Sequence, residues 1–311
     1  MFQHVMVPLD GSFRAEQALP VATRLARSTG GALLLVQVVS PPIDYSGGLS
    51  PIPLMNEQII ESEMTGAADY LTAIATRPEL AGIEVTTEVR FGFPSQQLIE
   101  VAGTHECDII VICSHGRTGF TRWALGSVAH TLVHQSTVPV LVLRQNDSLA
   151  HVKTAQSLYT LVPLDGSPMA EAALAPAVAL TAALAKPERG TLHLVQVVKD
   201  THAKAEEGEA CALNDEACLS ARSYLAMVAE HLRSQETSHT LAVTFSVERA
   251  SDVASALLSV AEQADPGGCD LIAISTHGRG GLERWVMGSV TQRLLETSRL
   301  PTMIVRPQHK G

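Results

Sequence analysis

The chain has 311 residues, a formal net charge of −10, 46% hydrophobic residues and only 4% aromatic residues. This acidic balance disfavours a nucleic-acid partner, because a negative chain repels phosphate backbones. The length predicts two domains, each large enough to bury its own core. No apolar run approaches the 18 residues of a membrane span, and the opening residues lack the basic segment and long apolar core of a secretory signal. We therefore expect a cytoplasmic protein with no membrane partner.

Two copies of one unit make up the sequence. Four blocks recur in the same order, which indicates duplication and fusion rather than a solenoid of many short units. The copies predict domains over 1–146 and 157–311, joined by a polar linker at 147–156. The matching blocks are VMVPLDGS (5–12) with TLVPLDGS (160–167), LLLVQVV (33–39) with LHLVQVV (192–198), SHGRTGFTRWALGSV (114–128) with THGRGGLERWVMGSV (276–290), and VPVLVLR (138–144) with LPTMIVR (300–306).

Strands and helices are predicted to alternate along the first copy. Apolar runs of strand length and helix-period patterns follow one another, with Asp10-Gly11-Ser12 as the first turn and either Asp10 or Ser12 as the cap of the first helix. The expected elements are a strand over 3–9, a helix over 13–29, a strand over 32–39, a proline-rich loop over 40–54, a helix over 56–76, a strand over 83–91, a helix over 94–104, a strand over 108–113, a helix over 126–136 and a strand over 138–144.

This alternation predicts an α/β fold, in which each domain is a doubly wound, five-stranded parallel sheet with helices on both faces. Ligands of such sheets lie beyond the carboxyl ends of the strands, where the strand order reverses. The Asp10 turn, the end of the second strand and the loop after the fourth strand all lie at that edge. The second copy brings Asp165, Val197 and Gly278 to the same places.

The loop after the fourth strand has the composition of an anion site. Gly116 and Gly119 allow close approach of the backbone, Arg117 offers a forked donor, and Gly126-Ser127 opens a helix whose N–H groups and dipole favour a phosphate. Glycine after a strand and Gly-Ser before a helix are also common in loops that bind no ligand. The repetition of the segment does not decide between the two, because duplication copies structure as well as function. The second copy carries the equivalent residues Gly278, Arg279, Gly280, Gly281, Gly288 and Ser289.

Several other residues near these loops can be explained by structural roles rather than by ligand binding or catalysis. Asp before Gly-Ser is an ordinary turn residue as well as a candidate ligand. His115 and His277 lack a partner carboxylate or nucleophile at a set spacing, so packing is favoured over catalysis. Trp123 and Trp285 are expected to anchor the loops, and the acidic segment 206–216 is expected to be a solvated loop or lid rather than a metal cage. An odd set of five cysteines without a CxxC pair indicates free thiols and no metal site: Cys107, Cys113, Cys211, Cys218 and Cys269.

Taken together, the early Val-Pro-Leu-Asp-Gly-Ser, the late glycine motif and the final apolar strand resemble the universal stress protein family, in its tandem form. The resemblance covers nearly the whole chain and implies an adenine nucleotide alpha hydrolase-like fold. In ATP-binding members the early Asp and a residue of the second strand hold the base, and the late motif holds ribose and phosphates. The resemblance therefore implies ATP, with or without Mg²⁺, at Pro8, Leu9, Asp10, Val38, Gly116, Arg117, Gly119, Gly126, Ser127 and Val128, and at Pro163, Leu164, Asp165, Val197, Gly278, Arg279, Gly281, Gly288, Ser289 and Val290.

The sequence departs from the family pattern where the late motif begins. Cys113 and Ser275 stand where the pattern has glycine. Two functions stay open: a stress-response protein that binds ATP as a sensor or switch, with slow hydrolysis at most, and a regulatory scaffold of the same fold that binds no nucleotide. An ATP-using ligase or nucleotidyl transferase is disfavoured, because its loop signatures and those of other common catalytic sites are missing from the sequence. The family dimerises through its last strand, so the resemblance also implies an intramolecular pseudo-dimer through 138–144 and 300–306, with a homodimer and protein partners left open.

Overall fold

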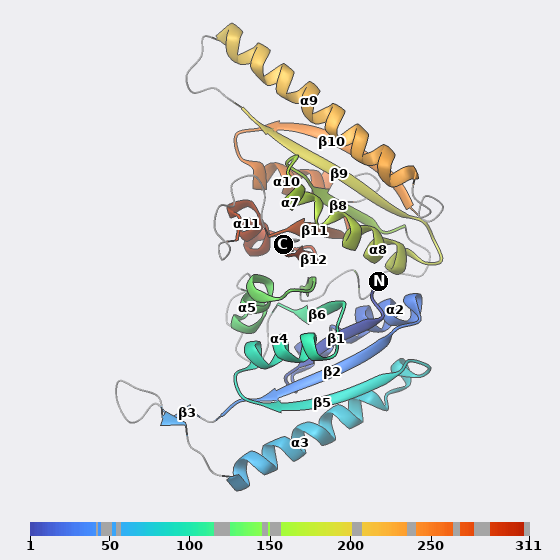
Figure 1. Ribbon diagram of the computed structural model, residues 1–311, viewed down its shortest axis with the longest axis vertical. Coiled ribbons are helices and arrows are strands. Elements are labelled where there is room, and N and C mark those ends of the chain that lie inside the picture. Colours follow the sequence, from blue (N-terminus) through green and yellow to red (C-terminus); the bar gives the residue numbers. More distant parts are fainter. Residues whose placement is uncertain are drawn as a thin grey trace. The chain divides into compact units, whose positions relative to one another are not determined.

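A computed structural model describes most of the chain, in two compact units, Met1–Gln145 and Asn146–Gly311, whose elements are labelled in Figure 1. The linker predicted at 147–156 falls outside the described residues except for Leu149. Side chains are described except at 43–44, 52–53 and 207–213. The described residues are 1–41, 43–44, 52–53, 57–114, 125–144, 149, 157–200, 207–234, 241–263, 268–276 and 287–307.

The first unit follows the predicted alternation of strands and helices. The strand β2 and the helix α4 have the predicted bounds, and the other predicted strands begin or end within two residues of expectation. A 3-10 turn, η1, precedes β5. The elements are β1 (His4–Leu9), α1 (Phe13–Glu16), α2 (Leu19–Thr29), β2 (Ala32–Val39), β3 (Ile43–Asp44), β4 (Ile52–Pro53), α3 (Glu57–Ala75), η1 (Pro78–Leu80), β5 (Val85–Phe91), α4 (Pro94–Thr104), β6 (Ile109–Cys113), α5 (Ser127–Gln135) and β7 (Val140–Leu143).

All five long strands of this unit are parallel, in the order β7-β6-β1-β2-β5. With right-handed crossovers this order places α1, α2 and α3 on one face of the sheet and α4 and α5 on the other. Contacts between α3 and β2, and between α4 and α5, agree with that division. Val5, Met6 and Val7 are fully buried between the two helical layers, as their apolar run predicts.

The second unit repeats this architecture. Its long strands are also parallel, in the order β10-β9-β8-β11-β12, so β8 and β11 correspond to β1 and β6. The elements are β8 (Tyr159–Pro163), α7 (Pro168–Glu171), α8 (Leu174–Ala185), β9 (Gly190–Lys199), α9 (Glu207–Ser234), β10 (Leu241–Ala250), α10 (Val253–Gln263), β11 (Leu271–Ser275), α11 (Ser289–Thr297) and β12 (Thr302–Val305).

Two expectations about local structure are wrong. The helix predicted over 13–29 is two helices, because α1 ends at Glu16 and α2 begins at Leu19 with Pro20 in its first turn, where proline is best tolerated. The acidic segment predicted as a loop at 206–216 is helical from Glu207 onward, as the opening of α9. Glutamate and alanine have high helix propensity, and this segment contains several of each.

One helical segment, Pro168–Ala185, is long and apolar enough to cross a membrane, although the sequence predicted no such run. The segment spans α7 and α8, and 56% of it is buried inside the structure. The residues of α8 at or below 7% exposure, where the helix packs against β8 and β9, include Ala177, Val178, Leu180, Thr181, Ala183, Leu184 and Ala185. This burial is that of a core helix.

Candidate functional site

The strand order places the candidate site where the chain reverses direction across the sheet. In the first unit β1 lies between β2, which follows it, and β6, which is reached only after the crossovers through α3 and α4. In the second unit β8 lies in the same way between β9 and β11. Crevices for ligands form beyond the carboxyl ends of such strands. The Asp10 turn and the Ser114–Gly126 loop follow the two strands of this point in the first unit, and the Asp165 turn and the Thr276–Gly288 loop follow them in the second.

The Asp-Gly-Ser turns share one hydrogen bond from the serine N–H to the aspartate, and in the second unit the Ser167 hydroxyl also donates to Asp165 Oδ1 at 2.6 Å. Asp10 Oδ1 accepts the backbone N–H of Ser12 at 3.0 Å, and Asp165 Oδ1 accepts that of Ser167 at 2.9 Å. The glycine between them has a φ of 78° in one unit and 80° in the other, a left-handed conformation that favours glycine. Both aspartates are half-buried. Their carboxylates are thus held at the carboxyl end of β1 and β8.

Serine, not aspartate, caps the helix that follows each turn. Ser12 Oγ accepts the N–H of Ala15, and Ser167 Oγ accepts the N–H of Ala170, each at 3.2 Å. The sequence left the cap open between Asp10 and Ser12, and the structure decides for Ser12. The aspartate is therefore not required as the helix cap, although it does stabilise the turn.

A backbone hydrogen bond joins the described ends of each late loop. Gly126 N–H donates to the carbonyl oxygen of Ser114 at 2.6 Å, and Gly288 N–H donates to that of Thr276 at 2.8 Å. A Cβ on Gly288 would lie 3.3 Å from that carbonyl oxygen, which is tighter than ordinary contact. Gly288 is thus explained by close approach of two backbone segments rather than by its dihedral angles, since φ at this glycine is −59°, as it is at Gly126.

The helices that follow these loops begin without a side-chain cap. Gly126 is the N-cap of α5 and Gly288 that of α11, and neither can offer a side-chain oxygen to the first turn. Ser127 and Ser289 stand at the first helical position and are exposed. The first N–H groups of an α-helix have no partner within the helix, and the dipole adds positive potential there. This arrangement can accept an anion in each unit.

Some of the remaining predicted site residues are described by the structure and others are not. Val38 and Val197 are half-buried near the carboxyl ends of β2 and β9, and Val128 and Val290 are half-buried at the start of α5 and α11. Pro8, Leu9, Pro163 and Leu164 are buried just before the aspartates. The other predicted residues, with their histidine and tryptophan neighbours, lie outside the described residues: His115, Gly116, Arg117, Gly119, Arg122, Trp123, His277, Gly278, Arg279, Gly280, Gly281, Arg284 and Trp285.

The departures from the family pattern do not interrupt the strands. Cys113 pairs with Leu143 and Ser275 with Val305 as the last residues of β6 and β11. Ser275 is buried, and its carbonyl oxygen accepts the Thr291 hydroxyl at 2.8 Å. Cys113 is half-buried and forms no disulfide with a described residue. A side chain is therefore accommodated at both positions in this fold.

A hollow of about 320 Å³ adjoins the Asp10 turn on the α3 face of the first unit. Its volume falls at the lower end of the range of small-molecule sites. The floor includes Gln37 from β2 and Ala67 from α3, and the remaining lining residues are Gly11, Ser62, Glu63, Gly66 and Tyr70. A Cβ on Gly66 would meet no atom within 4 Å, which agrees with open space at this point.

A tyrosine ties the helix α3 to α1 beside this hollow. Tyr70 Oη donates to Glu16 Oε1 at 3.0 Å, and Glu16 also pairs with Arg77 at 2.8 Å. Burial and then the hydrogen bond to Glu16 raise the pKa of the Tyr70 phenol, and the charge of Asp10 adds to the rise. Tyr224 donates to Glu171 Oε1 at 2.8 Å in the second unit, so the tie is repeated.

Sequence reasoning did not single out these tyrosines, or Gln37 and Gln196. The carbonyl oxygens Oε1 of the two glutamines are buried and accept no hydrogen bond from any described residue. The sequence does contain a signal for the glutamines. The apolar run LVQVV occurs in both copies, and glutamine is its one polar residue each time. The tyrosine ties carry no such signal, since the partners are more than 50 residues apart.

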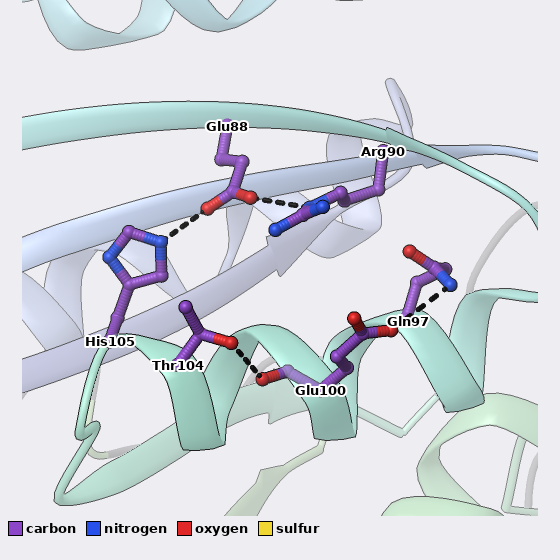
Figure 2. Close-up of polar contacts among 6 residues, drawn as sticks. All are labelled: Glu88, Arg90, Gln97, Glu100, Thr104 and His105. Carbon is purple, nitrogen blue, oxygen red and sulfur yellow. Dashed lines mark hydrogen bonds and ion pairs between the residues drawn. The ribbon is translucent and has the colours of Figure 1, made fainter.

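A second polar cluster of the first unit lies away from the Asp10 turn. Glu88 on β5 pairs with Arg90 at 2.5 Å and with His105, just past α4, at 2.6 Å, as Figure 2 shows. Gln97 and Glu100 lie along α4 beside it. The ion pairs join the end of α4 to an edge strand, so the cluster stabilises the packing of the α4 layer. Arg90 of this cluster is the register partner of Val38, near the carboxyl ends of β5 and β2.

Within the described residues, no group of three or more His, Cys, Asp or Glu side chains could hold a metal ion. The four cysteines of that part form no disulfide with one another: Cys107, Cys113, Cys218 and Cys269.

The geometry defines a class: a tandem pair of parallel α/β domains, each with an Asp-Gly-Ser turn and an uncapped helix N-terminus at its switch point. The sequence pattern of the Universal stress protein family matches residues 1–144 and 160–306, so the chain belongs to that family. A universal stress protein of Mycolicibacterium smegmatis is 28% identical over 312 residues, which cover 98% of this chain and 97% of that protein. Universal stress protein Rv2005c of Mycobacterium tuberculosis is 28% identical over 317 residues, with the same two coverages.

Solved structures agree on the fold. The crystal structure of a universal stress protein from Archaeoglobus fulgidus superposes with a TM-score of 0.68 at 19% identity, covering 98% of this chain and 99% of that chain. At this level of identity the likeness concerns the fold alone.

Proposed function

We propose that this member of the universal stress protein family is a cytoplasmic stress-response protein that binds ATP, as a sensor or switch, at one or both of its domains. One observation carries the proposal: in each unit the two segments at the switch point are an aspartate turn and an uncapped helix N-terminus. The first offers a carboxylate to the amino group of a base, and the second offers N–H donors to phosphate oxygens. The two features lie on adjacent strands, β1 with β6 and β8 with β11.

The charge balance of such a site suits ATP with Mg²⁺. The helix N-terminus supplies partial positive charge, and the ion would neutralise part of the remaining phosphate charge. Mg²⁺ is held chiefly by substrate phosphates and water in many nucleotide sites, so a dedicated protein cage is not required. We expect hydrolysis to be slow at most.

A scaffold that binds no nucleotide is the second candidate. Cys113 and Ser275 favour it, because each places a Cβ where ATP-binding relatives have glycine. The strands accept these side chains, so the fold would persist whether or not a nucleotide binds. Only a binding measurement separates the two functions.

The deciding experiment begins with the purified full-length protein. Acid extraction should release bound adenine nucleotide, and calorimetric titration with ATP–Mg²⁺ should give heat with one or two sites per chain. Absence of both signals at millimolar ATP would reject ATP binding and leave the scaffold function.

Substitutions then assign the sites to the domains. Asp10→Ala and Asp165→Ala should each remove or weaken one site by roughly tenfold or more, as expected for a lost charged hydrogen bond. Asp69→Ala, at an exposed position of α3, serves as the control and should bind like the wild type. A larger loss for Asp165→Ala would identify the second copy as the stronger site.

The pairing of the last strands, 138–144 with 300–306, stays a prediction from the sequence, as does the cytoplasmic location. Sedimentation of the full chain at micromolar concentration tests the first: intramolecular pairing is expected to leave the chain monomeric. Cell fractionation with a tagged chain tests the second.

A further inference from the structure

The glutamines of the second strand in each unit, Gln37 and Gln196, present a buried acceptor that no described residue uses. Gln37 Oε1 and Gln196 Oε1 are buried and accept no hydrogen bond from the described residues. Gln196 as a whole is 8% exposed. Leaving a buried carbonyl without a donor costs about 1–3 kcal/mol, and such groups in native proteins call for an explanation such as a ligand or a bound water.

Both copies keep this costly feature at one position. The strand segments around it have diverged elsewhere, since His193 in β9 stands where Leu34 stands in β2. A leucine or methionine would fill the same place without an orphaned carbonyl. The shared glutamine therefore points to a role common to both units.

The position is next to the aspartate turn. Gln37 pairs in register with Leu9, the residue before Asp10, and Pro163 pairs with Val195, the residue before Gln196. Gln37 also lines the hollow that includes Gly11 of the turn and Tyr70 of α3. Asp10 lies close enough to Tyr70 for its charge to act on the phenol. Gln37 and Gly11 of the Asp10 turn thus border one small space, and Asp10 is the residue directly before Gly11.

We propose that Gln37 and Gln196 are specificity-determining residues that accept a hydrogen bond from the exocyclic amino group of the bound nucleotide base. An amino group on a purine carries two N–H donors, and the aspartate and the glutamine supply one acceptor each. A turn about the last torsion of the glutamine, which is broad, presents Oε1 to the hollow. The pair selects an amino-bearing base over one with hydrogen or a keto oxygen at that position. This inference rests on the proposed ATP function and names the group that discriminates.

The remaining lining of the hollow suits the same chemistry. Ser62, Glu63 and Tyr70 add oxygen-bearing side chains to the lining, and the Tyr70 hydroxyl keeps its capacity to accept a hydrogen bond because its proton is donated to Glu16. A lining rich in acceptors favours a ligand edge that donates. A phosphate would be repelled by Glu63 and Asp10, which places the phosphates at the helix N-terminus instead.

The test compares two ligands that differ only in the amino group. ATP and purine riboside triphosphate, which has hydrogen in place of that group, are titrated with Mg²⁺ into the wild type and into Gln37→Met and Gln196→Met. Methionine matches the length of glutamine but has no carbonyl oxygen. We expect each substitution to weaken ATP binding in its own domain by roughly tenfold and binding of the analogue by no more than about twofold. Gln263→Met, on the exposed surface of α10, is the control and should change neither ligand.

A stability measurement adds a readout that a structural glutamine would not give. Removing an orphaned buried carbonyl should leave the ligand-free melting temperature unchanged or raised. Gln37→Glu and Gln196→Glu keep an acceptor oxygen that the methionine variants lack. These glutamate variants should therefore prefer ATP over the analogue, as the wild type does. A lowered melting temperature together with unchanged ATP affinity would show that a buried water satisfies the carbonyl, and this would overturn the inference.

The two proposals fail in different ways. If the wild type binds neither triphosphate, the ATP function is wrong and the inference goes with it. If the wild type binds ATP but both methionine variants bind it equally well, or lose both ligands to the same degree, only the role of the glutamines is wrong.

Discussion

The hydroxyl of Tyr70 donates a hydrogen bond to Glu16 across the gap between α3 and α1. Tyr224 and Glu171 repeat the contact in the second unit, so each long helix is tied to the helix that follows the Asp-Gly-Ser turn. Glu16 and Glu171 come only a few residues after Asp10 and Asp165. The tie therefore links the candidate binding edge to the outer helix of the same face.

The strength of this tie can be measured by a double-mutant cycle. Tyr70→Phe, Glu16→Ala and the double variant should show a coupling energy of about 1 kcal/mol, because the hydrogen bond has a charged acceptor but is only half-buried. Chemical unfolding followed by far-ultraviolet circular dichroism gives the four free energies of unfolding, those of the wild type and the three variants. Tyr224→Phe with Glu171→Ala should give a similar value, and additive effects at both sites would contradict the tie.

The raised pKa of Tyr70 predicts a stability loss in alkali. Burial and the bond to Glu16 favour the neutral phenol in the folded state, so its folded pKa lies above the unfolded value near 10. The sign follows from linkage: this contribution is fully present below pH 10 and is lost as the pH rises through the folded pKa. Absorbance at 295 nm should show a tyrosine that ionises later than the others and, in Tyr70→Phe, this late step should disappear.

Gly288 should not tolerate a side chain. Gly288→Ala places a Cβ about 3.3 Å from the carbonyl oxygen of Thr276, so the loop-closing hydrogen bond must lengthen. We expect a loss of about 1–2 kcal/mol in stability and weaker ATP binding in the second domain. Gly103→Ala, in α4 where a Cβ meets no atom within 4 Å, is the matched control and should stabilise by about 0.5–1 kcal/mol. Equal effects of the two substitutions would argue against the close approach.

The first unit lacks a helix cap that the second unit has. Asp252 precedes α10 and its Oδ1 accepts the N–H of Ser255 at 3.0 Å, whereas Phe93 precedes α4 with extended backbone and no side-chain cap. Phe93 is 59% exposed, so its ring contributes little burial. Phe93→Asp should therefore stabilise the protein by about 1 kcal/mol. Phe93→Ala is the comparison in thermal unfolding, and an aspartate variant no more stable than the alanine variant would contradict the expectation.

The described thiols should fall into two classes of reactivity. Burial raises the pKa of Cys107 to about 11 and that of Cys269 to about 12, with neighbouring carboxylates adding to each rise. Cys113 and Cys218 are partly exposed. At pH 8 a thiol reagent should modify Cys113 and Cys218 in the native protein, and Cys107 and Cys269 only after unfolding, as peptide mass mapping would show. Early labelling of Cys107 would contradict this order.

The candidate site was predictable only where it depends on local sequence. Asp10 and Asp165 follow apolar strands, and Gly126-Ser127 and Gly288-Ser289 open helices, so the order of elements alone sends them to one edge. The role of Ser12 as cap and the closure of the late loops were not predictable, because several nearby donors and acceptors compete for the same short-range bonds. The structure assigns one of them in each case.

The sequence by itself determined the duplication, the parallel α/β architecture and the bounds of elements such as β2 and α4, because apolar periodicity and turn residues act over a few neighbouring positions. Only the tertiary structure decided that Tyr70 meets Glu16, that Gly288 meets Thr276, and that Gln37 stands beside the Asp10 turn with a buried carbonyl oxygen that accepts no hydrogen bond from a described residue. These relationships join residues that are distant in the chain. They depend on how strands align and helices pack, and the sequence pattern of one segment does not predict which residues of another segment it will contact.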